Sequence, residues 1–323
     1  MKKLSILIPH YDEDKEYLYR ILDSIKIQQG VDLSEIQVIV ASDGYENHYE
    51  SYYDEPEYPF DIKYTYLSEH KGVSATRNEA LRCAEGEYVM FCDIDDMFAS
   101  VCALFIIFNE IEKGFDVLIS YFLEESKPTN FLLHQLDYTF VHGKVYRRKY
   151  LLNNNIYWNP DLTIHEDSYF NSLAINLADP DRVKVCTTPF YLWKWRDASV
   201  CRHDPKYILK TYNNMLDSST ALVREFTDRN RMQNAQNTVC NMIFDAYYTM
   251  NKEEWLNQEN KEYRRNTEDR FKKYYVEFYD LFHTIDQNTK NGIIAGCKNR
   301  KMLEGVFLEE VTFKDWIKMI MEG

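Results

Sequence analysis

The sequence predicts an α/β fold, with a mostly parallel sheet and flanking helices, followed by an α-helical C-terminal domain. Up to about residue 204, short apolar segments alternate with stretches of helical spacing, an order typical of parallel strands joined by helices. Beyond that point the apolar residues recur only at helical spacing. We therefore expect one domain over residues 1–204 and a helical domain over residues 205–323.

The elements of the first domain follow from local patterns, taken in chain order. Short apolar or alternating segments predict strands at residues 4–8, 38–41, 62–67, 88–92 and 117–120. Apolar residues at helical spacing predict helices at residues 15–29 and 73–84, and another around residues 104–111. Pro9 stops the first strand, because proline lacks the N–H that a continuing strand would use.

The two predicted domains also differ in charge. Apolar periodicity in the second domain predicts helices at residues 208–226, 235–250, 271–282 and 313–321. This domain holds 18 Lys and Arg against 18 Asp and Glu, whereas the first 204 residues hold 20 basic and 34 acidic groups. The first domain therefore carries the whole net charge of −14, which disfavours unassisted contact with a phosphate backbone. It is compatible with a nucleotide bridged by a metal ion.

The composition gives a further expectation about location. No apolar stretch approaches the roughly 18 residues of a membrane span, and the first residues show no signal-peptide pattern. The seven cysteines are scattered and lack CxxC spacing, which is typical of reduced thiols rather than of structural zinc. We therefore expect a cytoplasmic protein.

Polar side chains follow four of the predicted strands. Tyr11, Asp43, His70 and Asp93 each come shortly after a strand ends. Because ligands of parallel α/β sheets bind outside the carboxyl ends of the strands, we expect these four residues at one edge.

The fourth of these strands leads into an acidic pair. Residues two apart on a strand point to the same side, so we expect Asp93 and Asp95 to face together and to repel unless a cation lies between them. Hard oxygen ligands suit Mg²⁺ or Mn²⁺ bound together with substrate phosphates. A solvated acidic turn is the alternative for any single Asp-x-Asp motif.

Five motifs in order resemble those of glycosyltransferase family 2, the inverting enzymes with the GT-A fold. They are residues 5–12 (SILIPHYD), Ser42-Asp43-Gly44, residues 72–78 (GVSATRN), residues 93–96 (DIDD), and Glu166-Asp167 followed by residues 193–196 (WKWR). The resemblance covers about residues 1–204, and the stretch 165–170 is similar to that of phage-encoded members. Ala41 and Ser42 stand where the family often has a second acid before the Asp-Gly.

The resemblance implies a set of roles for donor binding. Tyr11 and Asp43 would hold the nucleobase by stacking and by accepting an N–H, and Asp93 would bind the ribose. Arg77 would lie near the base or the diphosphate. The donor-binding set is Pro9, Tyr11, Asp43, Arg77, Asp93, Trp195 and Arg196.

The resemblance also implies a metal and a base. Asp95 would bind Mn²⁺ or Mg²⁺, with Asp93 and His203 as further ligands. Asp167 would be the catalytic base and Glu166 would cap the helix or touch the acceptor. Neighbouring helical positions lie about 100° apart, so we expect only one of the two acids to face the site.

Each role has a structural alternative. Tyr11 could serve packing alone, and His203 could ligate nothing. Arg77 could pair with Glu79 or Glu85 on its own helix. Glu166 and Asp167 could interact with the helix dipole. Trp193 and Trp195 could form one face of a core strand.

The expected function is metal-dependent, inverting transfer of a sugar from a nucleotide diphospho-sugar to a hydroxyl of a surface glycan or a protein. A UDP-sugar is the expected donor. One alternative is a phage-type DNA glycosyltransferase acting on a hydroxylated pyrimidine, supported by interleaved basic and aromatic residues at 263–275. Another is a nucleotide-sugar or glycan-binding protein without turnover. No oligomeric state is predicted.

Overall fold

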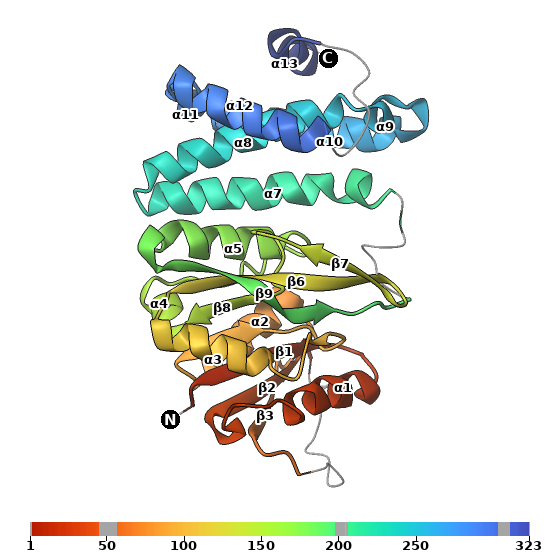
Figure 1. Cartoon of the computed structure of the whole chain (residues 1–323). Helices are drawn as coiled ribbons and strands as arrows, with labels where there is room; N and C mark the ends of the chain where they lie inside the picture. Colours follow the sequence, from red (N-terminus) through yellow and green to blue (C-terminus); the bar gives the residue numbers. More distant parts are fainter. Residues whose placement is uncertain (1, 45–56, 198–203, 205, 303–310, 323) are drawn as a thin grey trace. The chain divides into compact units, whose positions relative to one another are not determined.

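The computed structural model describes residues 2–44, 57–197, 204, 206–302 and 311–322. The chain divides into two compact units, Met1–Ser199 and Val200–Gly323 (Figure 1). This division falls close to the boundary expected at residue 204.

The first unit is built on a nine-stranded sheet with the order β3-β2-β1-β4-β8-β6-β9-β5, and β7 pairs with β6. The four strands β3, β2, β1 and β4 run parallel, as do β6 and β9, and the remaining pairs are antiparallel. The strands are β1 (Leu4–His10), β2 (Ile36–Ser42), β3 (Asp61–Tyr66), β4 (Tyr88–Phe91), β5 (Met97–Phe98), β6 (Val117–Lys127), β7 (Asn130–His134), β8 (Lys144–Arg147) and β9 (Val183–Trp193). The expected α/β fold with a mostly parallel sheet is confirmed.

Helices cover both faces of this sheet. The longer helices are α1 (Lys15–Lys26), α2 (Val73–Cys83), α3 (Ala103–Lys113), α4 (Arg148–Asn153) and α5 (Glu166–Leu177), with short 3₁₀ turns η1 (Leu33–Glu35) and η3 (Pro180–Arg182). The apolar stripes of α1 and α3 pack with alternate residues of β1, such as Ile6, in one buried core. On the other face, Phe170 of α5 stacks on Trp158 at 4.2 Å between ring centroids and meets Phe91 of β4 edge-on at 5.5 Å.

The second half of the sheet was not predicted in full. We expected a strand at residues 117–120, whereas β6 continues to Lys127, and β7, β8 and β9 have no counterpart among the predicted strands. The reason is that their patterns are weak: β8 has only four residues, and β9 is exposed over much of its length. These strands depend on pairing with β6 more than on their own apolar pattern.

The described residues of the second unit form helices joined by short connections. Its helices are α7 (Tyr207–Asp228), α8 (Met232–Met250), α9 (Glu253–Leu256), α10 (Lys261–Glu277), α11 (Tyr279–His283), α12 (Gln287–Met302) and α13 (Phe313–Glu322), with a 3₁₀ turn η4 (Gln258–Asn260). The expected helical C-terminal region is confirmed. The predicted helix 271–282 is divided between α10 and α11, and α12 was missed because its apolar residues form no clear stripe.

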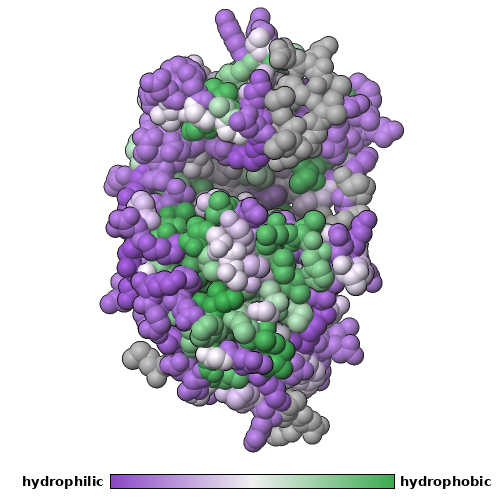
Figure 2. Space-filling view, viewed as in Figure 1, coloured by the Kyte–Doolittle hydropathy of each residue, from purple (hydrophilic) through white to green (hydrophobic). Residues whose placement is uncertain are grey.

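On the face drawn in Figure 2, apolar residues gather over the α/β unit, and hydrophilic residues surround them. Single exposed apolar side chains such as Phe105 are ordinary on a globular surface and indicate no function by themselves. None of the helices in the described ranges combines the length and the apolar composition that a membrane crossing requires.

Candidate active site

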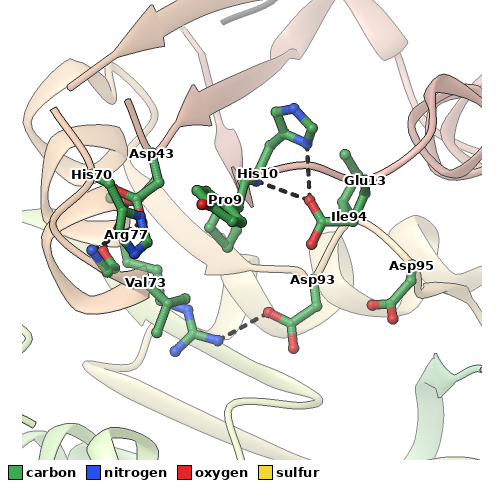
Figure 3. A pocket seen from close by; sticks show the side chains of 13 residues that line it. Pro9, His10, Glu13, Asp43, His70, Val73, Arg77, Asp93, Ile94 and Asp95 are labelled. Atoms are coloured by element: carbon green, nitrogen blue, oxygen red, sulfur yellow. Dashed lines mark hydrogen bonds and ion pairs between the residues drawn. The ribbon is translucent and has the colours of Figure 1, made fainter. Parts of the chain in front are cut away.

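A pocket of about 320 Å³ opens at the carboxyl ends of β1, β2, β3 and β4 (Figure 3). His70, which follows β3, forms part of its wall, so Tyr11, Asp43, His70 and Asp93 meet at one sheet edge as expected. Residues of the pocket wall that were named from the sequence as donor or metal ligands are Pro9, Tyr11, Asp43, Arg77, Asp93 and Asp95.

One corner of the pocket is organised by the buried carboxylate of Asp43. Its Oδ1 accepts a hydrogen bond from Lys71 N–H at 2.7 Å, and its Oδ2 accepts from Gly72 N–H at 2.9 Å and lies 2.8 Å from His70 Nδ1. Gly72 has φ +88°, a left-handed conformation that glycine adopts without strain. The Tyr11 ring lies 4.5 Å from the His70 ring between centroids and is 46% exposed, so Tyr11 is not a core residue.

Another part of the pocket wall is organised by the guanidinium of Arg77. Its Nη1 donates to Glu166 Oε1 at 3.0 Å and to Asp167 Oδ1 at 2.9 Å, and its Nη2 donates to Asp93 Oδ1 at 2.9 Å. The guanidinium also lies 4.4 Å from the centroid of the Trp158 ring. Burial alone would lower the pKa of Arg77, but the three carboxylates raise it overall. One cation thus binds three acids from two separate segments of the chain.

The pairing of Arg77 within its own helix does not occur. Glu79 instead accepts from Arg82 Nη2 at 2.6 Å and from Thr65 Oγ1 at 2.8 Å. Arg77 instead binds Asp93, Glu166 and Asp167, so the alternative of a pair within its own helix is wrong.

The geometry of the two motif acids corrects the expected strand alternation. β4 ends at Phe91, and the backbone then turns, with Asp96 N–H donating to Asp93 O at 3.1 Å. Asp93 and Asp95 therefore do not alternate as strand residues. Both line the pocket, but Asp93 binds Arg77 whereas Asp95 Oδ2 lies 3.3 Å from Arg196 Nη1 (Figure 3).

The two acids also differ in their electrostatics. Burial acts to raise the pKa of Asp93, yet the charges of Arg77 and His142 hold it well below its ordinary value. Burial, followed by the charge of Asp93, raises the pKa of Asp95. The pocket is therefore short of positive charge on the Asp95 side, which is the condition that a bound cation would relieve.

The sequence did not predict that His142 lies beside Asp93 and Asp96. Asp96 accepts from Tyr191 OH at 2.5 Å and from Lys194 N–H at 2.9 Å. His142 Nε2 lies 3.7 Å from both Asp93 Oδ2 and Asp96 Oδ2. Asp96 belongs to the quoted motif, but nothing near His142 in the sequence marks it, since the fold alone brings it to the acids.

Asp93, Asp96 and His142 could hold a metal ion, because one ligand atom from each lies within 4.8 Å of the others. Two carboxylates and an imidazole fit Mn²⁺ or, with water, Mg²⁺. These three residues differ in whether they line the pocket. Asp93 lines the pocket together with Asp95, whereas Asp96 and His142 are only 1% and 4% exposed.

Glu166 and Asp167 form the first turn of α5, and both face Arg77. This corrects the expectation that only one could face the site. His165 has φ +62° just before the helix, and the longer Glu166 side chain reaches the same Nη1 atom from the adjacent position. Asp167 Oδ2 also accepts from Val141 N–H at 3.0 Å. Burial, then the charge of Asp167, raises the pKa of Glu166 to about 7.

The remaining named residues follow β9. Trp195 N–H donates to Glu125 Oε2 at 3.1 Å, and its Nε1–H donates to Asp197 Oδ1 at 2.9 Å. Arg196 Nη1 lies 3.3 Å from Asp95 Oδ2. β9 ends at Trp193, so the two residues lie beyond the strand. The expected third metal ligand, His203, lies outside the described residues.

The pocket lies at the carboxyl edge of a parallel sheet, which is where α/β proteins of this class bind their ligands. The sequence profile described as Glycosyl transferase family 2 matches residues 5–171. The chain therefore belongs to glycosyltransferase family 2, a family of nucleotide-sugar transferases.

Two relatives with assigned names resemble parts of the chain. The poly(ribitol-phosphate) beta-N-acetylglucosaminyltransferase TarS of Staphylococcus aureus is 28% identical over 211 residues, which are 60% of this chain and 35% of TarS. The teichoic acid poly(glycerol phosphate) polymerase of Staphylococcus epidermidis is 35% identical over 107 residues, which are 32% of this chain and 14% of the polymerase. The chain matches about a third of the length of TarS and a smaller part of the polymerase.

The fold has a counterpart in a solved structure. The crystal structure of S. aureus TarS 1–349 is similar with a TM-score of 0.62 at 17% identity, covering 96% of this chain and 94% of that one. A structure of the same protein in complex with UDP-GlcNAc gives a TM-score of 0.61. The expected GT-A type of α/β fold is confirmed.

Proposed function

We propose that this protein transfers a sugar from a UDP-sugar, with inversion, to a hydroxyl group of a cell-surface glycan, and that it needs Mn²⁺ or Mg²⁺. One observation carries the proposal. Asp93, which lines the donor pocket, and Asp167, the expected base, accept hydrogen bonds from the same guanidinium of Arg77. The group that would remove a proton therefore lies next to the place where the donor would bind.

The donor side uses the corner around Asp43. Tyr11 would stack on the base, and Asp43 would accept an N–H from it through a remaining lone pair, with Pro9 beside them. Asp93 would bind the ribose. UDP is favoured because the structures of TarS include complexes with UDP and with UDP-GlcNAc.

The metal would lie on the pocket side of the acidic turn. Asp95 and Asp93 would hold it, since both line the pocket and Asp95 has the larger deficit of positive charge. His203 remains a proposed third ligand. Asp96 and His142 would support Asp93 from behind. A divalent cation at this position supplies charge neutralisation on the departing diphosphate.

The transfer step assigns the base role to Asp167. Its carboxylate would take the proton of the acceptor hydroxyl as that oxygen bonds to the anomeric carbon. The bond from this carbon to the diphosphate oxygen breaks on the opposite face, its electron pair leaves with UDP, and the configuration inverts. Arg196, beside Asp95, would contact the diphosphate. Glu166 would bind the acceptor, because a carboxyl with a pKa near 7 is partly protonated and can donate a hydrogen bond.

The acceptor is proposed from the named relatives. TarS is named for poly(ribitol-phosphate), and the S. epidermidis relative is named for poly(glycerol phosphate), so a polyol phosphate polymer is the first acceptor to test. A DNA acceptor is less well supported. In the basic and aromatic stretch, Arg264 pairs with Glu268 at 2.7 Å and Arg270 with Asp217 at 2.7 Å, so these cations already have acidic partners.

The test is release of UDP from UDP-GlcNAc with Mn²⁺, with and without poly(ribitol phosphate). Asp167→Asn should lower turnover by about 10²-fold or more while donor binding is retained, because a general base contributes about this factor. Glu166→Gln should be milder. An inactive Glu166→Gln beside an active Asp167→Asn would reverse the two roles. Binding of UDP-GlcNAc with no turnover, for any acceptor offered, would favour a binding protein.

A further inference from the structure

The segment of residues 137–141, between β7 and β8, carries the backbone group that holds Asp167. Val141 N–H donates to Asp167 Oδ2 at 3.0 Å, while Arg77 Nη1 donates to Oδ1 at 2.9 Å. One hydrogen bond to each oxygen fixes the plane of the carboxylate. The position of Val141 therefore decides how Asp167 is oriented.

Side chains hold this segment in shape, because it has no regular secondary structure. Asp137 Oδ1 accepts from Thr139 N–H at 2.9 Å and from Phe140 N–H at 2.8 Å. Lys144 is 0% exposed, donates through Nζ to Phe140 O and lies 3.7 Å from Asp137 Oδ1. The lysine closes the turn from the inside, and an ammonium is costly to bury unless it has such partners.

Asn171 ties the segment to the helix that carries Asp167. The two residues are four apart on α5 and so share one face. Asn171 is 0% exposed, and its Nδ2 donates to Thr139 O at 2.6 Å and to Phe140 O at 2.9 Å. Its Oδ1 accepts from Tyr146 OH at 2.5 Å. Both N–H groups of this buried amide are committed to the same turn.

We propose that Asn171 and Lys144 are positioning residues for the transfer step. They hold residues 137–141 so that Val141 N–H orients the Asp167 carboxylate toward the acceptor hydroxyl. This inference rests on the proposed function, in which Asp167 is the base. Because both side chains are fully buried, they act through Asp167 and not on a substrate.

The physical reason is the strict geometry of proton transfer. A lone pair of the base must point at the hydroxyl proton, and a displacement of about 1 Å can cost roughly 10²-fold in rate. Donor binding depends on other groups, at the ends of β1, β2 and β4. Loosening the segment should therefore lower kcat and leave the KM for the donor unchanged.

The main experiment replaces Asn171 with Leu, which has a similar volume and no N–H donors. With UDP-GlcNAc, Mn²⁺ and poly(ribitol phosphate), kcat should fall by about 10- to 100-fold with an unchanged donor KM. The matched control is Asn176→Leu, an exposed asparagine of the same helix whose Nδ2 bonds Ser172 O at 2.8 Å. This control should keep its kcat. Lys144→Met should behave like Asn171→Leu.

A second variant decides the matter if the buried substitutions do not fold. Asp137→Ala removes both hydrogen bonds to the turn and the ion pair with Lys144, but the Asp137 side chain is 20% exposed, so no fully buried side chain is replaced. Its kcat should fall at constant donor KM. Asp179→Ala removes the equivalent contact, to Asp181 N–H at 3.0 Å, from a turn elsewhere in the same unit and should leave kcat unchanged.

The outcomes separate this inference from the proposed function. Wild-type kcat in Asp137→Ala and in every folded variant at Asn171 or Lys144, beside an inactive Asp167→Asn, would overturn the positioning role alone. A fall in kcat no larger than that of the two controls would do the same. An active Asp167→Asn would instead overturn the assignment of the base, and with it the premise of the inference.

Discussion

Two charge clusters, one in each unit and each built on one buried side chain, differ in how completely their charge is balanced. In the α/β unit, the guanidinium of Arg77 forms ion pairs with Asp93, Glu166 and Asp167. In the helical unit, Asp245 on α8 accepts from Tyr212 OH at 2.6 Å, and Arg300 and Lys301 lie within 3.4 Å of its Oδ1. The first cluster has surplus acid beside a pocket, whereas the second has enough positive charge for its one acid.

The comparison indicates what each cluster is for. Buried charges are stable only when paired, so a balanced cluster is the expected result of selection for folding. A cluster with unbalanced charge costs stability and is expected where a ligand completes it. The Arg77 cluster therefore has the character of a site and the Asp245 cluster that of a structural support.

The largest expected effect comes from removing the shared cation. Arg77→Met leaves three partly buried carboxylates without their shared partner, so the free energy of unfolding should fall by about 3–5 kcal/mol and transfer should be lost. Urea unfolding and release of UDP measure the two effects. Arg77→Lys keeps the charge without the planar fork and should lose less stability. An Arg77→Met protein as stable as the wild type would contradict this account of the cluster.

The next effect concerns the position of the proposed metal ion, which Asp95 and His142 would influence differently. Asp95→Ala should lower metal-dependent turnover by about 100-fold or more, because it removes a proposed ligand, and loss of an outer-shell partner alone costs about 10- to 100-fold. It should not lower the free energy of unfolding, because burial and Asp93 disfavour the Asp95 carboxylate. His142→Phe, in its aromatic surroundings, should cost only about 10-fold in metal affinity. Mn²⁺ titrations of both variants provide the test. A larger loss of Mn²⁺ affinity in His142→Phe would indicate that the metal binds between Asp93, Asp96 and His142.

In the helical unit the expected effect is on stability alone. Asp245→Asn retains an acceptor for Tyr212 OH but removes the charge that faces Arg300 and Lys301. The free energy of unfolding should fall by about 1–3 kcal/mol, and kcat of the folded protein should not change. Circular dichroism in urea and a turnover assay measure these quantities. A large loss of kcat at full folding would give this cluster a functional role.

The smallest effect is the pH dependence of stability due to Glu166. The folded protein keeps this proton up to about pH 7, whereas the unfolded chain releases it near pH 4.5. The folded state binds more protons in this window, so stability falls as pH rises through it. Glu166→Gln should lack this component. Unfolding of both proteins at pH 5 and pH 7.5 compares the two slopes, and equal slopes would show that Glu166 titrates normally when folded.

The amino-acid sequence was enough to predict the strands and helices that have a clear local pattern. Apolar runs and helical spacing are properties of short segments, and they predicted β1 to β4, α1, α2 and α3, and four helical stretches after residue 204. The rule that parallel strands end at one edge then brought Tyr11, Asp43, His70 and Asp93 together before any coordinates were known.

The hydrogen bonds and ion pairs among these groups, in contrast, became clear only from the tertiary structure. Arg77 meets acids 16, 89 and 90 residues away, and His142 reaches Asp93 and Asp96 from another strand connection. Such contacts depend on the path of the whole backbone, about which a local pattern carries no information. The same holds for the turn after Phe91, which separates Asp93 from Asp95, and for β8 and β9, whose weak patterns depend on pairing with β6.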